Sequence, residues 1–463
     1  MENRRQSIVL FPFMAQGHFI PFLALAQLLE QKGFSIVFVS TPLNVKNLQN
    51  SLSSPSSSVK FAQVSFNAAD HGLPPDAENT DSLPNDLIIP FVNATPSLKL
   101  PFRALLSDLI KGGENLLCVV SDFFFGWAAD VAHEFGILHL IFSVTGGFGM
   151  ACYYSMWLNS PHRDSQSVEF LLPDFPEAGK IHITQVTPAM LVATEKDPLT
   201  NFMREKIAVR KLGIPVWAIG PLLLSEKDRS STGRRSTISP EDCIQWMDQK
   251  EPNSVIYISF GSQNTIPASQ MMKLAKALDS SSRNFIWVVR PPLGFDINAE
   301  FLAEEWLPEG FLQRIREQDR GLIISKWAPQ VEILAHKSVA AFISHCGWNS
   351  VLETMKYGVP VIGWSMAADQ HYNAKFLVDK AGICVEMARG ISFEVMPEDI
   401  VDKIEFMMGE GGEGMRKKAC EIKETIKDAM RDEESYRGSS VKNVQEFITA
   451  AFLRKEKTSA YTK

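Results

Sequence analysis

The sequence predicts an α/β protein with two successive doubly wound domains, each a parallel sheet covered by helices on both faces. Three observations predict this class. Short apolar runs alternate with helical stretches in both halves of the chain, a strongly polar stretch at 225–239 separates the halves, and the alternation then restarts. Buried parallel strands are short continuous apolar runs, and helices connect them.

The first half supplies the elements of the first predicted domain, residues 1–224. The predicted strands are 7–13, 34–40, 116–121 and 138–143, and the predicted helices are 21–32 and 127–135. The run at 8–15 could be mistaken for a signal peptide, but Gln16-Gly17-His18 interrupts it. A strand, a turn and a helix therefore explain the N-terminus better than a leader segment.

The second half repeats the pattern after the predicted linker at 225–239. The predicted strands are 254–260, 285–290, 321–325, 340–344 and 359–364, and the predicted helices are 270–278 and 349–357. We place the second domain at 240–440 and a C-terminal helix with a frayed tail at 441–463. In doubly wound domains, ligands bind at the carboxyl ends of the strands and at helix N-termini.

The composition limits the class of protein and its partners. The 463 residues carry a net charge of −7, which disfavours nucleic acid, and the chain has no long apolar run that would predict a membrane span. The six cysteines form no CxxC pair, so we expect reduced thiols in a cytoplasmic protein. A monomer is the default expectation.

Several motifs of other chemistries are missing from the sequence. It contains no GxxxxGK[ST] loop, HExxH, GxSxG or DxD pattern and no recognisable metal-ligand cluster, so we expect neither a metal nor a cofactor. A GxGxxG match at 409–414 follows a helical stretch instead of a strand and contains two glutamates. We therefore interpret it as a loop.

The most informative stretch is 327–370, WAPQVEILAHKSVAAFISHCGWNSVLETMKYGVPVIGWSMAADQ. A strand ends at its centre and a helix opens after His345-Cys346-Gly347, so backbone N–H groups and the helix dipole there favour an anion. Taken alone, Ser350 and Glu353 also fit a capping box, Trp327 a core residue and Asp369 a helix cap.

This stretch resembles, over its whole length, the signature box of plant family-1 UDP-glycosyltransferases, which have the GT-B fold of two Rossmann-like domains. Further similar segments are 12–21, 121–127, 219–222 and 257–262, so the resemblance spans nearly the whole chain. It implies an N-terminal domain that binds the acceptor, a C-terminal domain that binds the UDP-sugar, and a last helix that packs back on the first domain.

The resemblance also implies roles for individual residues. His18 would be the catalytic base and Asp122 would orient it, although either residue alone could be a turn or cap residue. Trp327 would stack on the nucleobase of the UDP-sugar, Glu353 would bind its ribose, and Asp369 and Gln370 would bind its sugar. The residues implied for UDP-sugar binding are Ser262, Trp327, Ala328, Gln330, His345, Gly347, Trp348, Asn349, Ser350, Glu353, Asp369 and Gln370.

The implied reaction is the inverting, metal-independent transfer of glucose from UDP-glucose to a hydroxyl of a small apolar plant metabolite. Gln370 at the end of the box, with Trp348 inside it, favours glucose. Flavonoid, phenolic, terpenoid and hormone acceptors all fit. We expect an aromatic acceptor wall, with ordinary core as the alternative, formed by Phe123, Phe124, Phe148, Met150 and Trp157.

One departure from the family pattern is the short segment 204–215, where a strand and a helix of the first domain are missing. It makes a catalytically silent UDP-sugar-binding isoform one alternative. Use of another UDP-sugar is a second alternative. A nicotinamide-dependent dehydrogenase is a third, but it would need a GxGxxG between a strand and a helix.

Overall fold

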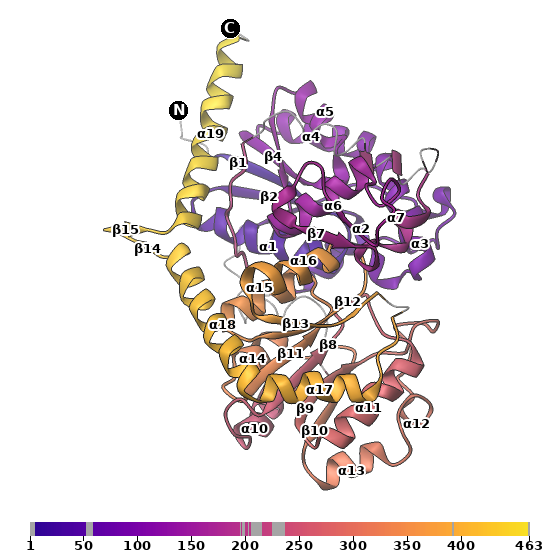
Figure 1. Cartoon of the computed structure of the whole chain (residues 1–463). Helices are drawn as coiled ribbons and strands as arrows, with labels where there is room; N and C mark the ends of the chain where they lie inside the picture. The colour runs from indigo at the N-terminus through magenta and orange to yellow at the C-terminus, as the bar shows by residue number, and fades with distance from the viewer. Residues whose placement is uncertain are drawn as a thin grey trace. The chain divides into compact units, whose positions relative to one another are not determined.

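The computed structural model describes residues 5–51, 59–194, 196, 200–201, 203–204, 215–224, 237–390 and 393–461. The chain forms two compact units (Figure 1). The first comprises Met1–Val144, Thr194–Gly233 and Ala429–Lys463, and the second comprises Thr145–Ala193 and Arg234–Asp428.

The first unit contains a parallel sheet in the order β3-β2-β1-β4-β5. This is the Rossmann strand order without its sixth strand, with the switch point between β1 and β4. Its strands are β1 (Ser7–Phe11), β2 (Ser35–Ser40), β3 (Lys60–Gln63), β4 (Leu116–Asp122) and β5 (Leu138–Phe142).

Helices surround this sheet. They are α1 (Gln16–Gln31), α2 (Pro42–Ser51), α3 (Asn85–Ala94), α4 (Lys99–Lys111), α5 (Ala128–Glu134) and the long C-terminal α19 (Ser439–Tyr461), with 3₁₀ turns η1 (Ala68–His71), η2 (Thr80–Ser82), η3 (Thr95–Leu98) and η4 (Phe123–Phe125) and a hairpin of β14 (Asp432–Glu433) and β15 (Tyr436–Arg437).

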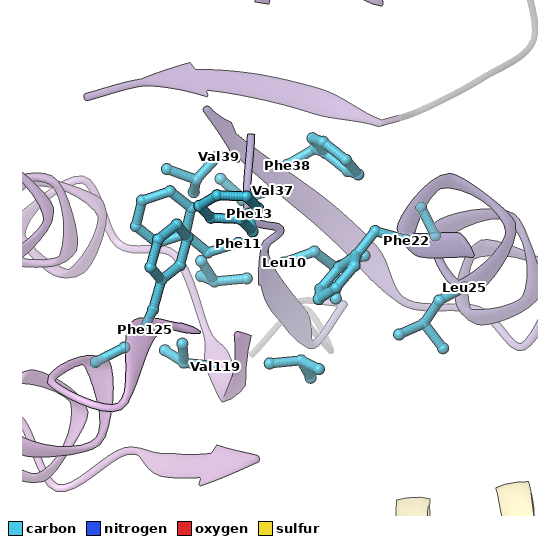
Figure 2. Packing of buried hydrophobic residues seen from close by; sticks show 14 of the residues in the cluster. Leu10, Phe11, Phe13, Phe22, Leu25, Val37, Phe38, Val39, Val119 and Phe125 are labelled. Carbon is cyan, nitrogen blue, oxygen red and sulfur yellow. The ribbon is translucent and has the colours of Figure 1, made fainter. Parts of the chain in front are cut away.

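The side chains of β1 fill the core on both faces of the first sheet. All five residues of the strand are buried, because it lies in the middle of the sheet. Leu10 points toward Phe22 of α1, whereas Phe11 points to the opposite side, where its ring centre lies 4.6 Å from that of Phe125 (Figure 2). A strand buried on both faces explains the uninterrupted apolar run in the sequence.

Helix α19 packs on the first sheet. Phe447 and Ile448 are buried in the same core as β1 and β4. Lys455 fixes the far end of the contact, since its Nζ donates hydrogen bonds to Gln6 Oε1 at 2.7 Å and to the carbonyl oxygen of Leu116 at 2.7 Å. The last helix is therefore part of the first unit.

The second unit contains a six-stranded parallel sheet in the order β10-β9-β8-β11-β12-β13. This is the complete Rossmann order, with the switch point between β8 and β11. Its strands are β8 (Val255–Ser259), β9 (Asn284–Val289), β10 (Gly321–Ser325), β11 (Val339–Ser344), β12 (Val361–Ser365) and β13 (Cys384–Arg389).

Helices complete the second unit, and a small hairpin accompanies them. They are α6 (Gly147–Asn159), α7 (Pro188–Val192), α10 (Pro240–Asp248), α11 (Ala268–Ser281), α12 (Ala303–Trp306), α13 (Phe311–Glu317), α14 (Gln330–Ala335), α15 (Trp348–Tyr357), α16 (Gln370–Phe376), α17 (Pro397–Met408) and α18 (Glu410–Ala429), with β6 (Glu169–Leu171), β7 (Lys180–His182), turns η5 (Pro176–Ala178) and η6 (Ile183–Gln185), and a π-helical turn η7 (Leu377–Ala381).

Two local predictions are wrong. Helix α1 begins at Gln16 instead of at Pro21, so His18 lies in its first turn and Pro21 lies inside the helix. The glycine-rich segment 409–414 is not a loop, because α18 begins at Glu410, directly after α17. Glycine allows the two helices to meet so closely: a Cβ at Gly412 would lie 1.7 Å from the carbonyl oxygen of Met407.

The unit boundaries differ from the predicted domain boundaries in two respects. Residues 429–440, predicted to belong to the second domain, are grouped with the first unit. Residues 145–193, which precede the predicted linker, are grouped with the second unit. The short segment 204–215 and the linker 225–239 fall almost entirely outside the described residues. No helix of the part that the structure describes has the length and apolarity needed to cross a bilayer.

Candidate functional site

His18 and Asp122 lie at the switch point of the first sheet. Asp122 is the last residue of β4, and His18 stands in the first turn of the helix that follows the neighbouring strand β1. Both side chains therefore emerge at the carboxyl ends of adjacent strands whose connections run in opposite directions. That is the position where doubly wound sheets bind ligands.

The two side chains form a tight hydrogen-bonded pair. His18 Nδ1 lies 2.6 Å from Asp122 Oδ2, and the Asp122 side chain is fully buried whereas that of His18 is 17% exposed. Asp122 Oδ1 accepts the backbone N–H of Phe124 at 3.1 Å, which fixes the carboxylate plane. With Nδ1–H donated to the carboxylate, Nε2 is the ring nitrogen that can accept a proton.

Aromatic rings surround His18 on several sides. The ring centres of Phe13 and Phe124 lie 5.2 Å and 5.8 Å from the imidazole, and that of Phe123 lies 6.4 Å away. Phe123 itself is only 8% exposed. The surroundings of the base are therefore apolar, which suits a ligand with an apolar body and a hydroxyl.

The switch point of the second sheet holds His345. It follows β11, and its imidazole is enclosed by two glycines: a Cβ at Gly261 or at Gly347 would lie 2.5 Å or 2.4 Å from His345 Nε2. Gly261 also has φ of +83°, a conformation that favours glycine. Burial lowers the pKa of His345 to about 4, so the ring is neutral near pH 7.

The N-terminus of α15 lies directly after His345 and Cys346 in the chain. Its N-cap is Gly347, and no side chain caps it. Ser350 is the third residue of this helix, not its cap, so the alternative of a Ser350–Glu353 capping box is wrong. Asn349 is half-buried in the same first turn, and Ser262 is half-buried in the loop after β8. An uncapped N-terminus of this kind leaves backbone N–H groups for an anion.

Gln330 connects the start of the box to α15. Its Nε2 donates hydrogen bonds to Ser350 Oγ at 3.1 Å and to Glu353 Oε2 at 2.6 Å, while its Oε1 accepts the hydroxyl of Tyr257 at 3.0 Å. Glu353 and Tyr257 are buried. Trp327 and Ala328 precede Gln330 in the chain. Trp327 is half-buried, and Ala328 is 5% exposed.

Asp369 and Gln370 form the start of α16. Asp369 occupies the N-cap position, but its side chain does not cap the helix. Its Oδ2 instead accepts hydrogen bonds from Thr145 Oγ1 and from Asn373 Nδ2. Gln370 Oε1 accepts the backbone N–H groups of Met366 and Ala367, both at 3.0 Å, so its amide NH₂ remains the donor end.

The predicted acceptor residues fall in different units. Phe123 and Phe124 lie beside His18 in the first unit, and Phe148, Met150 and Trp157 lie on α6 in the second. Met150 and Trp157 are 7% and 3% exposed. Phe148 contacts the rings of Phe175 and Phe376, with centres 5.4 Å and 5.8 Å away. An acceptor wall built from these residues stays a prediction.

Sequence reasoning missed several residues that shape the site. Tyr257, Thr145 and Asn373 each hydrogen-bond a predicted site residue. Gly146 lets α6 approach the box, since a Cβ there would lie 2.6 Å from the indole of Trp348. Of the missed residues, only Tyr257 lies within a segment that resembles the family in sequence.

Within the described residues, no group of three or more His, Cys, Asp or Glu side chains could hold a metal ion. The six cysteines are free thiols, five of them buried.

Comparisons with known proteins show the family to which the chain belongs. The family described as "UDP-glucoronosyl and UDP-glucosyl transferase" matches residues 232–400, and "Glycosyltransferase, N-terminal domain" matches residues 5–152. The chain is 43% identical to UDP-glycosyltransferase 92A1 of Arabidopsis thaliana over 98% of both chains. It is 36% identical to crocetin glucosyltransferase 3 of Crocus sativus over 84% of this chain and 89% of that protein.

A solved structure shows the same fold. The crystal structure of Glycyrrhiza uralensis UGT73P12 complexed with glycyrrhetinic acid 3-O-monoglucuronide matches with a TM-score of 0.83 and 27% identity, over 99% of this chain and 98% of that one. The fold is therefore GT-B and the protein is a glycosyltransferase, as the sequence predicted. The chain belongs to the plant UDP-glycosyltransferase family.

Proposed function

We propose that this enzyme transfers glucose from UDP-glucose to a hydroxyl of a small, largely apolar plant metabolite, with inversion at the anomeric carbon and without a metal. The observation that carries the proposal is the His18–Asp122 pair, 2.6 Å apart at the first switch point. The first unit supplies this base, and the second unit binds the donor.

His18 takes the proton of the acceptor through its Nε2 atom. Asp122 accepts Nδ1–H of His18, so the lone pair of Nε2 takes the proton of the acceptor hydroxyl. The acceptor oxygen forms a bond to the anomeric carbon as the bond from that carbon to the UDP oxygen breaks. The electron pair leaves with UDP, and Asp122 stabilises the imidazolium that His18 has become.

The second unit stabilises the leaving group. The uncapped N-terminus of α15 and the hydroxyls of Ser262 and Ser350 bind the diphosphate, with Asn349 nearby. His345 contributes as a neutral hydrogen-bonding ring, because its burial disfavours the charged form. These groups replace the charge that a metal would supply.

The remaining box residues recognise the rest of the donor. Trp327 and Ala328 bind the uracil, and Glu353, oriented by Gln330, accepts ribose hydroxyls. Asp369 presents a hydrogen-bond acceptor and Gln370 a donor to the sugar. Such a pair discriminates between hydroxyl configurations, and we assign it to glucose.

The acceptor is recognised by its apolar body. Phe13, Phe123 and Phe124 surround the base, and a hydroxyl presented beside them meets the open nitrogen of His18. The names of the relatives support this class: one is called a crocetin glucosyltransferase, and the solved structure holds glycyrrhetinic acid 3-O-monoglucuronide.

The test is a transfer assay with purified full-length protein, UDP-glucose and a panel of flavonoid, phenolic and terpenoid alcohols. We expect release of UDP together with a product that carries one added hexose, and weaker turnover with UDP-galactose or UDP-xylose. Folded protein that binds UDP but transfers no sugar to any acceptor would favour a silent UDP-sugar-binding isoform. Faster transfer from another UDP-sugar would overturn the assignment to glucose.

A further inference from the structure

Asn373 lies on α16, one helical turn after Asp369, and is fully buried. Its side-chain Nδ2 donates two hydrogen bonds: one to Asp369 Oδ2 at 2.9 Å and one to the backbone carbonyl of Cys346 at 3.2 Å. Cys346 is the residue between His345 and Gly347. One amide group thus joins the carboxylate at the end of the box to the loop at its centre.

A second hydrogen bond to Asp369 helps to determine the orientation of its carboxylate. Thr145 Oγ1 donates to the same Oδ2, so this oxygen accepts two donors from two different segments of the second unit. Two fixed donors on one oxygen hold the plane of a carboxylate. The Oδ1 atom of Asp369 then faces a defined direction, and Asp369 is only half-buried.

Asn373 is itself held by the packing of α6. A Cβ at Gly149 would lie 2.3 Å from Asn373 Oδ1, so only glycine at this position of α6 leaves room for the amide. A rotation of the amide by half a turn would direct Oδ1 at the Asp369 carboxylate and at the Cys346 carbonyl, where three oxygens would repel one another. The donor orientation of Asn373 is therefore fixed.

We propose that Asn373 is a positioning residue for the donor sugar. It acts through Asp369, whose free oxygen it aims at the sugar, and it holds that carboxylate in register with the diphosphate-binding loop. The inference rests on the proposed function, since it needs Asp369 to bind the sugar. It adds a residue beyond the box, in a segment whose sequence predicts no role.

Binding measurements test this without depending on turnover. The dissociation constants of UDP and of UDP-glucose are measured by calorimetry for the wild type and for Asn373→Ala, alongside kcat and KM. We expect UDP-glucose binding to weaken by about tenfold, the effect of losing a hydrogen bond to a charged group, and UDP binding to change much less. Selectivity for UDP-glucose over UDP-galactose falls with it.

The control is Asn159→Ala. Asn159 ends α6 and also donates its Nδ2 to a hydroxyl and a carboxylate, those of Ser155 and Asp174. It lies outside the box, so both affinities stay within twofold or so of the wild type. If Asn373→Ala does not fold, Asn373→Ser keeps a polar group in the buried site and is measured instead.

A double-mutant cycle with Asp369→Asn separates positioning from general packing. If Asn373 acts through the carboxylate, Asn373→Ala costs little further affinity for UDP-glucose once Asp369 has been replaced. Independent, additive losses would overturn the proposal, as would an equal loss of UDP and UDP-glucose binding. A wild type that binds UDP-glucose but transfers nothing would instead contradict the proposed function.

Discussion

His18 and Asp122 are 104 positions apart in the chain, yet their side chains meet at 2.6 Å, with the carboxylate fully buried beneath the ring. The parallel sheet brings them together because β1 and β4 are neighbours and both side chains leave at the carboxyl ends. The carboxylate fixes which nitrogen of His18 is open to a ligand. The pair is thus oriented before any acceptor binds.

Replacement of Asp122 by Asn should lower kcat by about 100-fold or more, because an amide cannot stabilise the imidazolium and can stabilise the wrong tautomer. Steady-state kinetics with the best acceptor provide the measurement. Asp130→Asn is the control, since Asp130 pairs with Lys99 at 3.1 Å on the exposed side of α5. Similar losses in both variants would show that the effect is not specific to the base.

Addition of one methyl group at Gly347 should weaken UDP binding about tenfold or destabilise the second unit by roughly 1–3 kcal/mol, because the new Cβ would lie 2.4 Å from His345 Nε2. Gly147→Ala is the matched control: it also stands at the start of a helix, and a Cβ there meets nothing within 4 Å. Calorimetry with UDP and thermal melting distinguish the two. Unchanged UDP binding and unchanged stability in Gly347→Ala would show that Gly347 does not lie against the His345 ring.

Loss of the Tyr257 hydroxyl should raise KM for UDP-glucose several-fold, while kcat changes less. Tyr257→Phe removes one hydrogen bond from Gln330, worth about 0.5–1.5 kcal/mol, and frees the amide that orients Glu353. Tyr372→Phe serves as the comparison, since that buried hydroxyl donates to the sulfur of Met190, at 3.9 Å, and not to a residue of the box. An equal rise of KM in both variants would rule out a specific role for Tyr257.

Stability should fall as the pH drops from about 6.5 toward 4. Burial lowers the pKa of His345 and His371 to about 4, with the charge of Arg389 adding to the effect on His371. The unfolded chain, where histidine titrates near 6.5, binds more protons in this window, so the folded state loses stability there and keeps it fully above pH 6.5.

The measurement is urea unfolding at pH 7.5 and pH 5.5. Each buried histidine should cost about 1 kcal/mol of unfolding free energy at the lower pH, and His371→Asn should reduce the fall by that amount. His371 contacts the Ser365 hydroxyl at 2.7 Å, which asparagine can also do. An unaltered pH dependence in the variant would show that His371 is not buried in its neutral form.

In the two parallel sheets, the central strands and the edge strands β5 and β10 could be predicted from the sequence, but the edge strands β3 and β13 could not. Strands β1, β4, β8 and β11 are buried on both faces, so the sequence shows them as continuous apolar runs. Strand β3 has four residues with exposed ends, Lys60 and Gln63, and leaves no such run. Helix α1 was predicted to start too late, because Pro21 is typical of a first turn yet lies within the helix.

The site was predicted to the extent that its residues form a contiguous pattern. The box at 327–370 gave the residues around His345, but the hydrogen bond from Thr145 to Asp369 joins positions 224 apart. Asn373 carries no signal of its own, because a buried asparagine on a helix is recognised only by the groups it bonds. Pairing across such distances follows from the sheet order and from helix packing, which local patterns do not contain.

The most direct test of the account compares His18→Ala with the wild type for turnover of UDP-glucose and for binding of UDP. The variant removes the base from the first unit and leaves the donor site of the second unit unaltered. We predict that transfer to the acceptor falls by at least about 100-fold while the dissociation constant of UDP stays within about twofold. Undiminished transfer by folded His18→Ala would contradict the assignment of His18 as the base.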